Sequence, residues 1–249
     1  LKRVRWWFKG TVIKYFVKRD ADAYVTQTED VSVRLSEWTK IKPVYTVTNT
    51  SGRYFDSFEP GKLILPPRQS QDEFRLLFLS AYYAHKNFGI ISPVVKELKR
   101  NNVMNVKFVL TLPEDELEEI ISEELREFVI NIGPVRPEQC PQLYSEIDAT
   151  FLPTLLECFS ATYVESMKMG RPILTSNLGF AHTVCGTAAL YFDPMDPKDI
   201  VKKIEQIIND RELRDALVNS GEVQLRNFNT ASERAAKFLS ICEVLAYGA

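Results

Sequence analysis

The chain has 249 residues, of which 45% are hydrophobic, so it is long enough to bury a sizeable core in one or two domains. Its net charge of −2 argues against a nucleic-acid partner, and its four scattered cysteines and two histidines argue against a zinc site or a disulfide framework. No apolar run reaches the roughly 18 residues that a transmembrane helix needs, and no signal-peptide pattern opens the chain. We therefore expect a cytoplasmic protein with reduced thiols.

The first element in chain order is a basic and aromatic helix over residues 1–19. It carries seven basic residues and no acidic one, interleaved with aromatic side chains. Two interpretations remain open. Either the helix lies on an anionic membrane surface, which would make the protein peripheral on the inner membrane face, or it packs its aromatic face on a neighbouring sheet.

Two short strands follow, over residues 23–28 and 43–48, and they flank a helix near residues 30–38. These strands are too few to close a domain. Residues 1–68 are therefore expected to be the remnant of a preceding α/β domain and its linker. Asp20 and Asp22 form an Asp-x-Asp pair, but the pair precedes a strand instead of following one, which favours a solvated turn over a metal site.

From residue 69 on, strand-like and helix-like segments alternate, which is typical of an α/β sheet wound with helices. The strands are continuously apolar, which predicts a Rossmann-like parallel sheet with helices on both faces. Strands are expected over 75–80, 106–112, 128–135, 147–153, 172–176 and 189–192. Helices are expected within 87–100, over 113–127 and 137–146, from Ser160 to Gly170, from Asp196 on, over 211–220 with Gly221 as its stop, and over 231–246.

Two glutamates, Glu157 and Glu165, stand between a strand that ends at Pro153 and a strand that begins at Pro172. If a helix begins near Ser160, the first glutamate lies on the loop before it and the second lies in its second turn. The free backbone amides of the helix start then lie between two carboxylates, where they form an anion site. Carboxylate, amides and carboxylate are the right order for hexose, diphosphate and ribose. A solvated glutamate pair on an ordinary connection explains the spacing about as well.

The segment from Thr150 to Ser176 resembles the donor-site signature of the retaining glycosyltransferases of family 4, also called glycosyltransferase group 1. It reads T-F-L-P-T-L-L-E-C-F-S-A-T-Y-V-E-S-M-K-M-G-R-P-I-L-T-S. The resemblance implies the two-domain GT-B architecture, with the active site between an acceptor domain and a nucleotide-sugar domain. It implies that residues 69–228 are the donor domain, that 1–68 end the acceptor domain, and that 229–249 form a helix crossing back toward the acceptor side.

The resemblance also assigns roles to individual residues. Glu165 matches the glutamate that binds the ribose hydroxyls, Glu157 the one that contacts the donor sugar near the reacting centre, and Lys86 the lysine that neutralises the diphosphate. The loop whose backbone amides meet the sugar and the diphosphate corresponds to Phe159, Ser160, Ala161 and Thr162. The strand end where the base docks corresponds to Gly133, Pro134 and Val135.

Four positions depart from the family pattern. Ala81 replaces an arginine that often precedes the lysine, Cys158 and Ser160 replace loop glycines, and Thr183 stands where an acidic residue is often found. These departures concern phosphate affinity and sugar preference and do not affect the expected fold.

The function implied by the resemblance is transfer of a hexose with retention, in bacterial cell-surface polysaccharide biosynthesis. The implied donor is a UDP- or GDP-sugar, the implied acceptor is a saccharide or a lipid-linked molecule, and no metal or other cofactor is expected. Two alternatives stay open: a nucleotide-sugar 2-epimerase of the same architecture, or a non-catalytic nucleotide-binding or scaffold protein, which Ala81 favours. Because residues 1–68 cannot supply a whole acceptor domain, this chain alone is expected to bind a nucleotide without transferring sugar.

Overall fold

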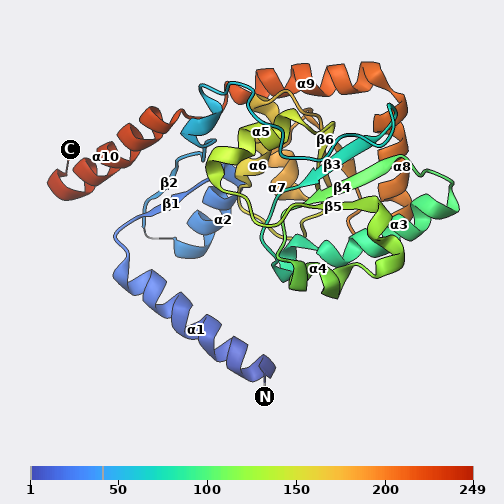
Figure 1. Cartoon of the computed structure of the whole chain (residues 1–249). Coiled ribbons are helices and arrows are strands. Elements are labelled where there is room, and N and C mark those ends of the chain that lie inside the picture. Colours follow the sequence, from blue (N-terminus) through green and yellow to red (C-terminus); the bar gives the residue numbers. More distant parts are fainter. Residues whose placement is uncertain (1, 41, 249) are drawn as a thin grey trace. The chain divides into compact units, whose positions relative to one another are not determined.

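The computed structural model describes residues 2–40 and 42–248, which form two compact units. The smaller unit contains the chain up to Asn49 and the stretch from Ser232 on, and the larger unit runs from Thr50 to Ala231. Figure 1 labels the helices and most of the strands of both units.

In the smaller unit, two short strands pair in parallel, with Tyr24 beside Val44. Its elements are α1 (Lys2–Asp20), β1 (Tyr24–Thr26), α2 (Glu29–Thr39), β2 (Val44–Thr46) and nearly all of α10 (Ala231–Tyr247). The expected basic helix, the two strands and the helix between them are thus present. Residues 11–20 of α1 are exposed to solvent. Over the described residues, no helix combines the length and the apolar character needed to cross a membrane.

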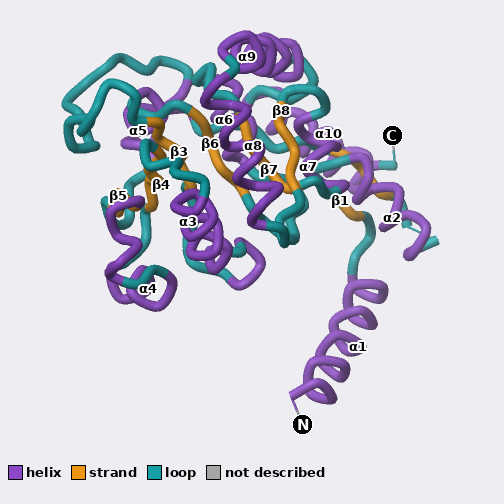
Figure 2. Tube along the Cα trace, turned by 90° about the vertical axis from the view of Figure 1, so that its right-hand side faces the viewer, coloured by secondary structure: helices purple, strands orange, loops and turns teal. Residues whose placement is uncertain are grey.

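The larger unit is built on a parallel sheet of six strands in the order β5-β4-β3-β6-β7-β8 (Figure 2). The strands are β3 (Phe74–Phe78), β4 (Val106–Leu110), β5 (Val129–Asn131), β6 (Ala149–Leu152), β7 (Ile173–Ser176) and β8 (Ala189–Phe192). The predicted parallel α/β fold is therefore confirmed. The strand expected over 128–135 is shorter than predicted, because the left-handed Gly133 (φ 70°) and the following Pro134, which has no amide hydrogen, end the extended run.

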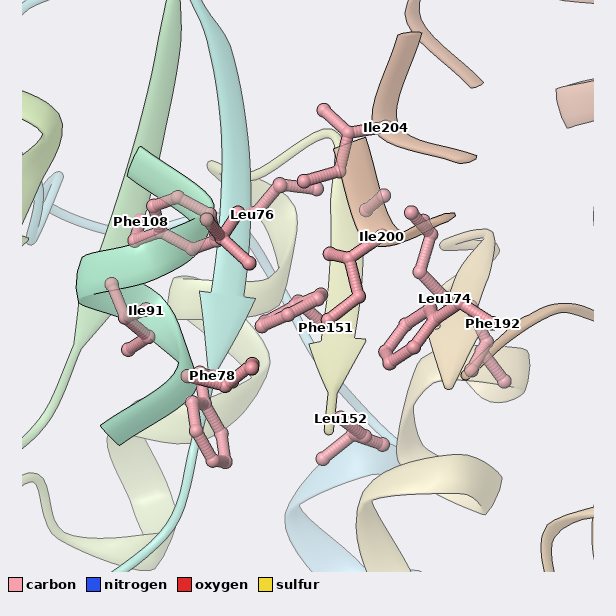
Figure 3. Close-up of a cluster of buried hydrophobic side chains, with 14 of the residues drawn as sticks. Leu76, Phe78, Ile91, Phe108, Phe151, Leu152, Leu174, Phe192, Ile200 and Ile204 are labelled. Carbon is pink, nitrogen blue, oxygen red and sulfur yellow. The ribbon is translucent and has the colours of Figure 1, made fainter. Parts of the chain in front are cut away.

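Helices cover both faces of this sheet, as its continuously apolar strands require. On one face, α3 and α8 pack on each other and over Leu76, Phe108 and Phe151 (Figure 3). On the other face, α5 packs over Leu77 and Val109, whose side chains alternate with those of the first set. The helices of this unit are α3 (Ile91–Arg100), α4 (Glu114–Ile120), α5 (Cys140–Ser145), α6 (Ala161–Lys168), α7 (Gly179–Cys185), α8 (Pro197–Asn209) and α9 (Arg211–Leu225).

Residues 51–68, expected to link two domains, are instead part of the larger unit. Phe55 and Leu65 are buried in the hydrophobic cluster that covers the α5 face of the sheet. The backbone amides of Ile64 and Leu65 donate hydrogen bonds of 2.9 and 2.7 Å to the carboxylate of Glu146. The structure therefore divides after Asn49 and not after Arg68.

The helix expected over 211–220 is also longer than predicted, because α9 continues to Leu225. Gly221 is buried inside this helix and does not end it, so its assignment as a stop was wrong. A Cβ atom added to Gly221 would lie 3.1 Å from Cγ of Met167 on α6. The glycine therefore serves the close packing of α9 on α6.

The direction in which successive strands are added across the sheet reverses between β3 and β6. The chain adds β4 and β5 on one side of β3, then returns and places β6 on its other side. In open α/β sheets, ligands bind in the crevice outside the carboxyl ends of the strands at such a reversal. The loops that follow Phe78 and Leu152 border this crevice.

Candidate functional site

Lys86 and Glu157 meet at this crevice. The lysine ends a single 3-10 turn after β3, and the glutamate lies in the loop after β6. Lys86 Nζ and Glu157 Oε2 are 2.5 Å apart, and the two side chains are only 14% and 20% exposed. The two loops are also joined through their backbones, since the amide of Leu155 donates to the carbonyl of His85 at 2.8 Å. The crevice thus holds a partly desolvated cation and anion side by side.

The turn that carries Lys86 is fixed by the residues that follow it. Asn87 adopts the left-handed conformation (φ 61°), and its side-chain amide donates a 2.9 Å hydrogen bond to the carbonyl of Pro194, beyond β8. The ring of Phe88 stacks on Phe78 of β3 with 4.0 Å between the ring centroids. The backbone of Lys86 is therefore held on the sheet, and only its long side chain has freedom to change partners.

The start of α6 lies between the two glutamates of the sequence motif, as predicted. Ser160 is the N-cap residue, with extended backbone angles, and its side chain makes no capping hydrogen bond. The amides of Ala161 and Thr162 begin the helix, where no preceding turn supplies carbonyl acceptors. The loop is anchored by Phe159, which is buried and packs edge-on against Phe228 with 5.5 Å between the ring centroids. The helix start therefore presents backbone donors on a loop of fixed position.

Glu165 lies in the second turn of α6, also as predicted, and faces α5. Its Oε2 accepts a 3.1 Å hydrogen bond from the hydroxyl of Tyr144. Burial raises the pKa of Glu165 above its ordinary value, and the hydrogen bond from Tyr144 opposes that rise. Burial, together with the negative charge of Glu165, also raises the pKa of the Cys140 thiol to about 11, so this cysteine is neutral. Glu165 and Glu157 thus have separate surroundings, one beside a phenol and a thiol, the other beside an ammonium group.

A cavity of about 420 Å³ opens at the carboxyl ends of β3, β4 and β5. Pro134 and Val135, which the resemblance assigns to the base, form part of its wall. Ala81, the residue that replaces the family arginine, also lines the cavity, and its lining residues include no lysine or arginine. The remaining lining residues are Leu79, Ser80, Thr111, Pro113 and Glu116.

A second cavity, of about 380 Å³, lies beyond the ends of β7 and β8 and was not anticipated from the sequence. Asn177 and Asp193, which directly follow these strands, line it together with Leu155. The Oδ1 atom of Asn177 is 2.7 Å from Nε2 of His182, whose ring stacks on Tyr191. Polar residues placed directly after strands were the available signal for this cavity.

Within the described residues, no three histidine, cysteine, aspartate or glutamate side chains lie close enough together to hold a metal ion. Asp20, the first member of the Asp-x-Asp pair, ends α1 and forms a 2.5 Å ion pair with Arg19.

Comparison with known proteins gives one family and one curated relative. A family model described as glycosyl transferases group 1 matches residues 65–224. An uncharacterized glycosyltransferase of Methanocaldococcus jannaschii is 25% identical over 158 residues, which are 61% of this chain and 40% of that protein. The chain therefore spans less than half the length of this relative.

The solved structures that match this fold include glycosyltransferases of the GT-B type. A sucrose-phosphate synthase from Thermosynechococcus elongatus has a TM-score of 0.78 at 17% identity and is matched over 96% of this chain and 62% of its own. Anabaena HepE, solved with UDP and glucose, has a TM-score of 0.73 at 16% identity over 92% of this chain and 66% of its own. At these identities the likeness concerns the fold.

Proposed function

Because this chain belongs to the glycosyl transferases of group 1, we propose that its larger unit binds the donor of a retaining, family 4 glycosyltransferase. The observation that carries the proposal is the contact between Lys86 and Glu157 at the topological switch point of the sheet. A cation there can bind a diphosphate, and a carboxylate beside it can bind the hexose. The reaction is transfer of a hexose from a nucleotide sugar to a saccharide or lipid-linked acceptor.

The nucleotide extends from the 420 Å³ cavity toward the start of α6. The base occupies the cavity at Pro134 and Val135, whose walls are mainly apolar. The ribose hydroxyls donate to Glu165, and the diphosphate meets Lys86 and the first amides of α6. HepE was solved with UDP and glucose, which makes UDP the first nucleotide to test.

To bind the diphosphate, the ammonium group of Lys86 must either contact Glu157 and the phosphate together or leave Glu157 for the phosphate. In the free protein its ammonium group is neutralised by Glu157. When a phosphate takes over this contact, the Glu157 carboxylate becomes free to accept hydrogen bonds from the hexose hydroxyls. The ion pair therefore keeps two charges ready in the crevice, where each would be costly to bury alone.

The proposed chemistry passes through an oxocarbenium-like state. As the bond between sugar and phosphate breaks, negative charge grows on the leaving diphosphate, and Lys86 with the amides of α6 stabilises that charge. The leaving phosphate can take the proton of the acceptor hydroxyl, so no protein base is required. Glu157 then lies next to the sugar ring, where positive charge develops.

The acceptor and the place of action are part of the same proposal. A role in bacterial cell-surface polysaccharide synthesis would bring the enzyme to lipid-linked acceptors at the inner face of the membrane. The exposed part of α1 would suit that place, because the apolar Ile13 and Phe16 lie among the basic Lys14 and Lys18.

The test is the variant Lys86→Ala, compared with Lys96→Ala, which changes an exposed lysine of α3. Lys86→Ala should weaken UDP by about tenfold or more but leave uridine binding unchanged, because only the diphosphate contacts the ammonium group. Isothermal titration calorimetry at two salt concentrations measures both ligands, and the difference should shrink as salt rises. Equal losses for UDP and uridine would indicate a folding defect and contradict the assignment.

A further inference from the structure

Tyr144 is a buried residue whose position suggests a role in the donor site, although it lies outside the motif. It stands on α5 and is 0% exposed. Its ring packs edge-on against Phe55 at 5.7 Å between centroids, inside the hydrophobic cluster that covers the α5 face of the sheet. The ring is therefore fixed by packing, and its hydroxyl has one direction in which to point.

That hydroxyl points at the carboxylate of Glu165. It donates to Oε2 over 3.1 Å, and within the described residues no other side chain or backbone group donates to this carboxylate. Oε1 and the second lone pair of Oε2 remain for a ligand. A carboxylate has about four acceptor sites, so the contact with Tyr144 leaves enough of them for a pair of neighbouring hydroxyls.

We propose that Tyr144 is a positioning residue for the ribose site: by holding Oε2 of Glu165, it aims the rest of the carboxylate at the two ribose hydroxyls of the nucleotide. This inference rests on the proposed function, because it takes Glu165 as the ribose acceptor. A glutamate on a helix has three flexible side-chain torsions, and an anchored oxygen reduces the entropy lost when the ligand binds.

The other charged and titratable groups near Glu165 do not replace this contact. Cys140, on the same helix as Tyr144, is the second titratable group that faces it, and its thiol is neutral. Lys168, one turn further along α6, is engaged with Asp56. The Tyr144 hydroxyl is thus the group that offsets the effect of burial and helps to keep the carboxylate ionised.

The sign of the expected change follows from this arrangement. Removing the hydroxyl leaves the burial of Glu165 in place but removes the donor that stabilises its charge, so the pKa of Glu165 should rise further. Ribose hydroxyls donate to the ionised carboxylate. As the pH is lowered, the variant should therefore begin to lose affinity for the nucleotide at a higher pH than the unaltered protein does.

The experiment uses Tyr144→Phe in the whole chain, with uridine diphosphate as the ligand. Calorimetry between pH 5.5 and 8.5 should show an affinity about tenfold lower than that of the unaltered chain near neutral pH. The loss of affinity on the acidic side of the profile should also occur at higher pH than in the unaltered chain. Carbon-13 NMR of the Glu165 carboxyl in the free protein should show its titration displaced in the same direction. A purely structural role would weaken binding without moving either titration.

Tyr163→Phe is the matched control, because Tyr163 is equally buried and its hydroxyl contacts Thr175 at 2.8 Å instead of a carboxylate. It should leave both titrations in place. In a Glu165→Ala background, Tyr144→Phe should cause no further loss of affinity. If Tyr144→Phe fails to fold, a fluorinated tyrosine at position 144, a stronger donor of the same shape, should displace the Glu165 titration to lower pH.

The outcomes separate the two proposals. Failure of the unaltered chain to bind UDP or GDP would contradict the proposed function. Normal binding by the unaltered chain, with an unmoved pH profile and an unmoved Glu165 titration in Tyr144→Phe, would overturn the positioning role alone.

Discussion

At the scale of single residues, the two glutamates of the motif lie in different environments. Glu157 is held by an ammonium group, whereas Glu165 is half-buried beside a phenol and a neutral thiol. Burial works against ionisation of Glu165, and the donor that faces it is a neutral phenol, whereas the partner of Glu157 is a cation. The two glutamates of one motif thus have different surroundings, and we propose different ligand groups for them, the hexose for Glu157 and the ribose for Glu165.

Glu157→Ala tests this division in a protein extended to the length of its relatives, since this chain is expected to bind without transferring. Turnover should fall by about a hundredfold or more, because the side chain is proposed to act where charge changes in the transition state. Affinity for UDP should stay largely intact, since Lys86 then meets the diphosphate without a competing carboxylate. Steady-state rates and calorimetry measure the two quantities. A parallel loss of both would place Glu157 in nucleotide binding instead.

At the scale of elements, the position of α6 depends on α9. The two helices pack closely where Gly221 of α9 meets Met167 of α6. Because α6 carries both the amides of the proposed anion site and Glu165, a displacement of this helix would move both.

Gly221→Val should therefore destabilise the larger unit by about 1–3 kcal/mol, as expected for overpacking a close contact, and should weaken UDP as well. Urea denaturation followed by calorimetry measures the two effects. Gly10→Val is the matched control, because Gly10 lies within α1 of the smaller unit and an added Cβ there meets nothing within 4 Å. A Gly221→Val protein as stable as the unaltered chain would show that α9 can move away without cost.

At the scale of the whole molecule, each candidate donor residue falls within one compact unit. Lys86, Gly133 to Val135, Glu157, Phe159 to Thr162 and Glu165 all lie between Thr50 and Ala231. The hydrophobic clusters that support them belong to the same unit. The smaller unit adds a two-stranded sheet, and its assignment as part of an acceptor domain stays a prediction.

Residues 50–231 alone should consequently fold and bind UDP with the affinity of the whole chain, and neither form should transfer sugar. In the proposed reaction, nucleotide binding needs the donor domain alone, whereas transfer also needs an acceptor domain. Thermal-shift and calorimetric measurements on both forms test the first expectation, and a transfer assay tests the second. A large loss of affinity on removing residues 1–49 and 232–249 would place part of the nucleotide site in the smaller unit.

Much of this protein could be predicted from local patterns in its sequence. The strands of the larger unit are short apolar runs between turn residues, and all six were located, although several boundaries differ. Asp196 was predicted as an N-cap, and its side chain accepts from the amide of Lys198 at 2.9 Å. Such signals suffice because a cap or an apolar run acts on its own neighbours in the chain. The motif around the two glutamates likewise indicated the family that the comparisons show.

Only the tertiary structure decided which distant residues meet. Lys86 and Glu157 are 71 positions apart, and Tyr144 lies 21 positions before the carboxylate that it holds. Their contacts follow from the return of the chain from β5 to the far side of β3, and no local pattern specifies that strand order. Gly221 shows the same limit, because a glycine suits both a helix end and a close helix contact. Whether Gly221 ends its helix or packs against another depends on the position of α6, and that position is set by the tertiary fold.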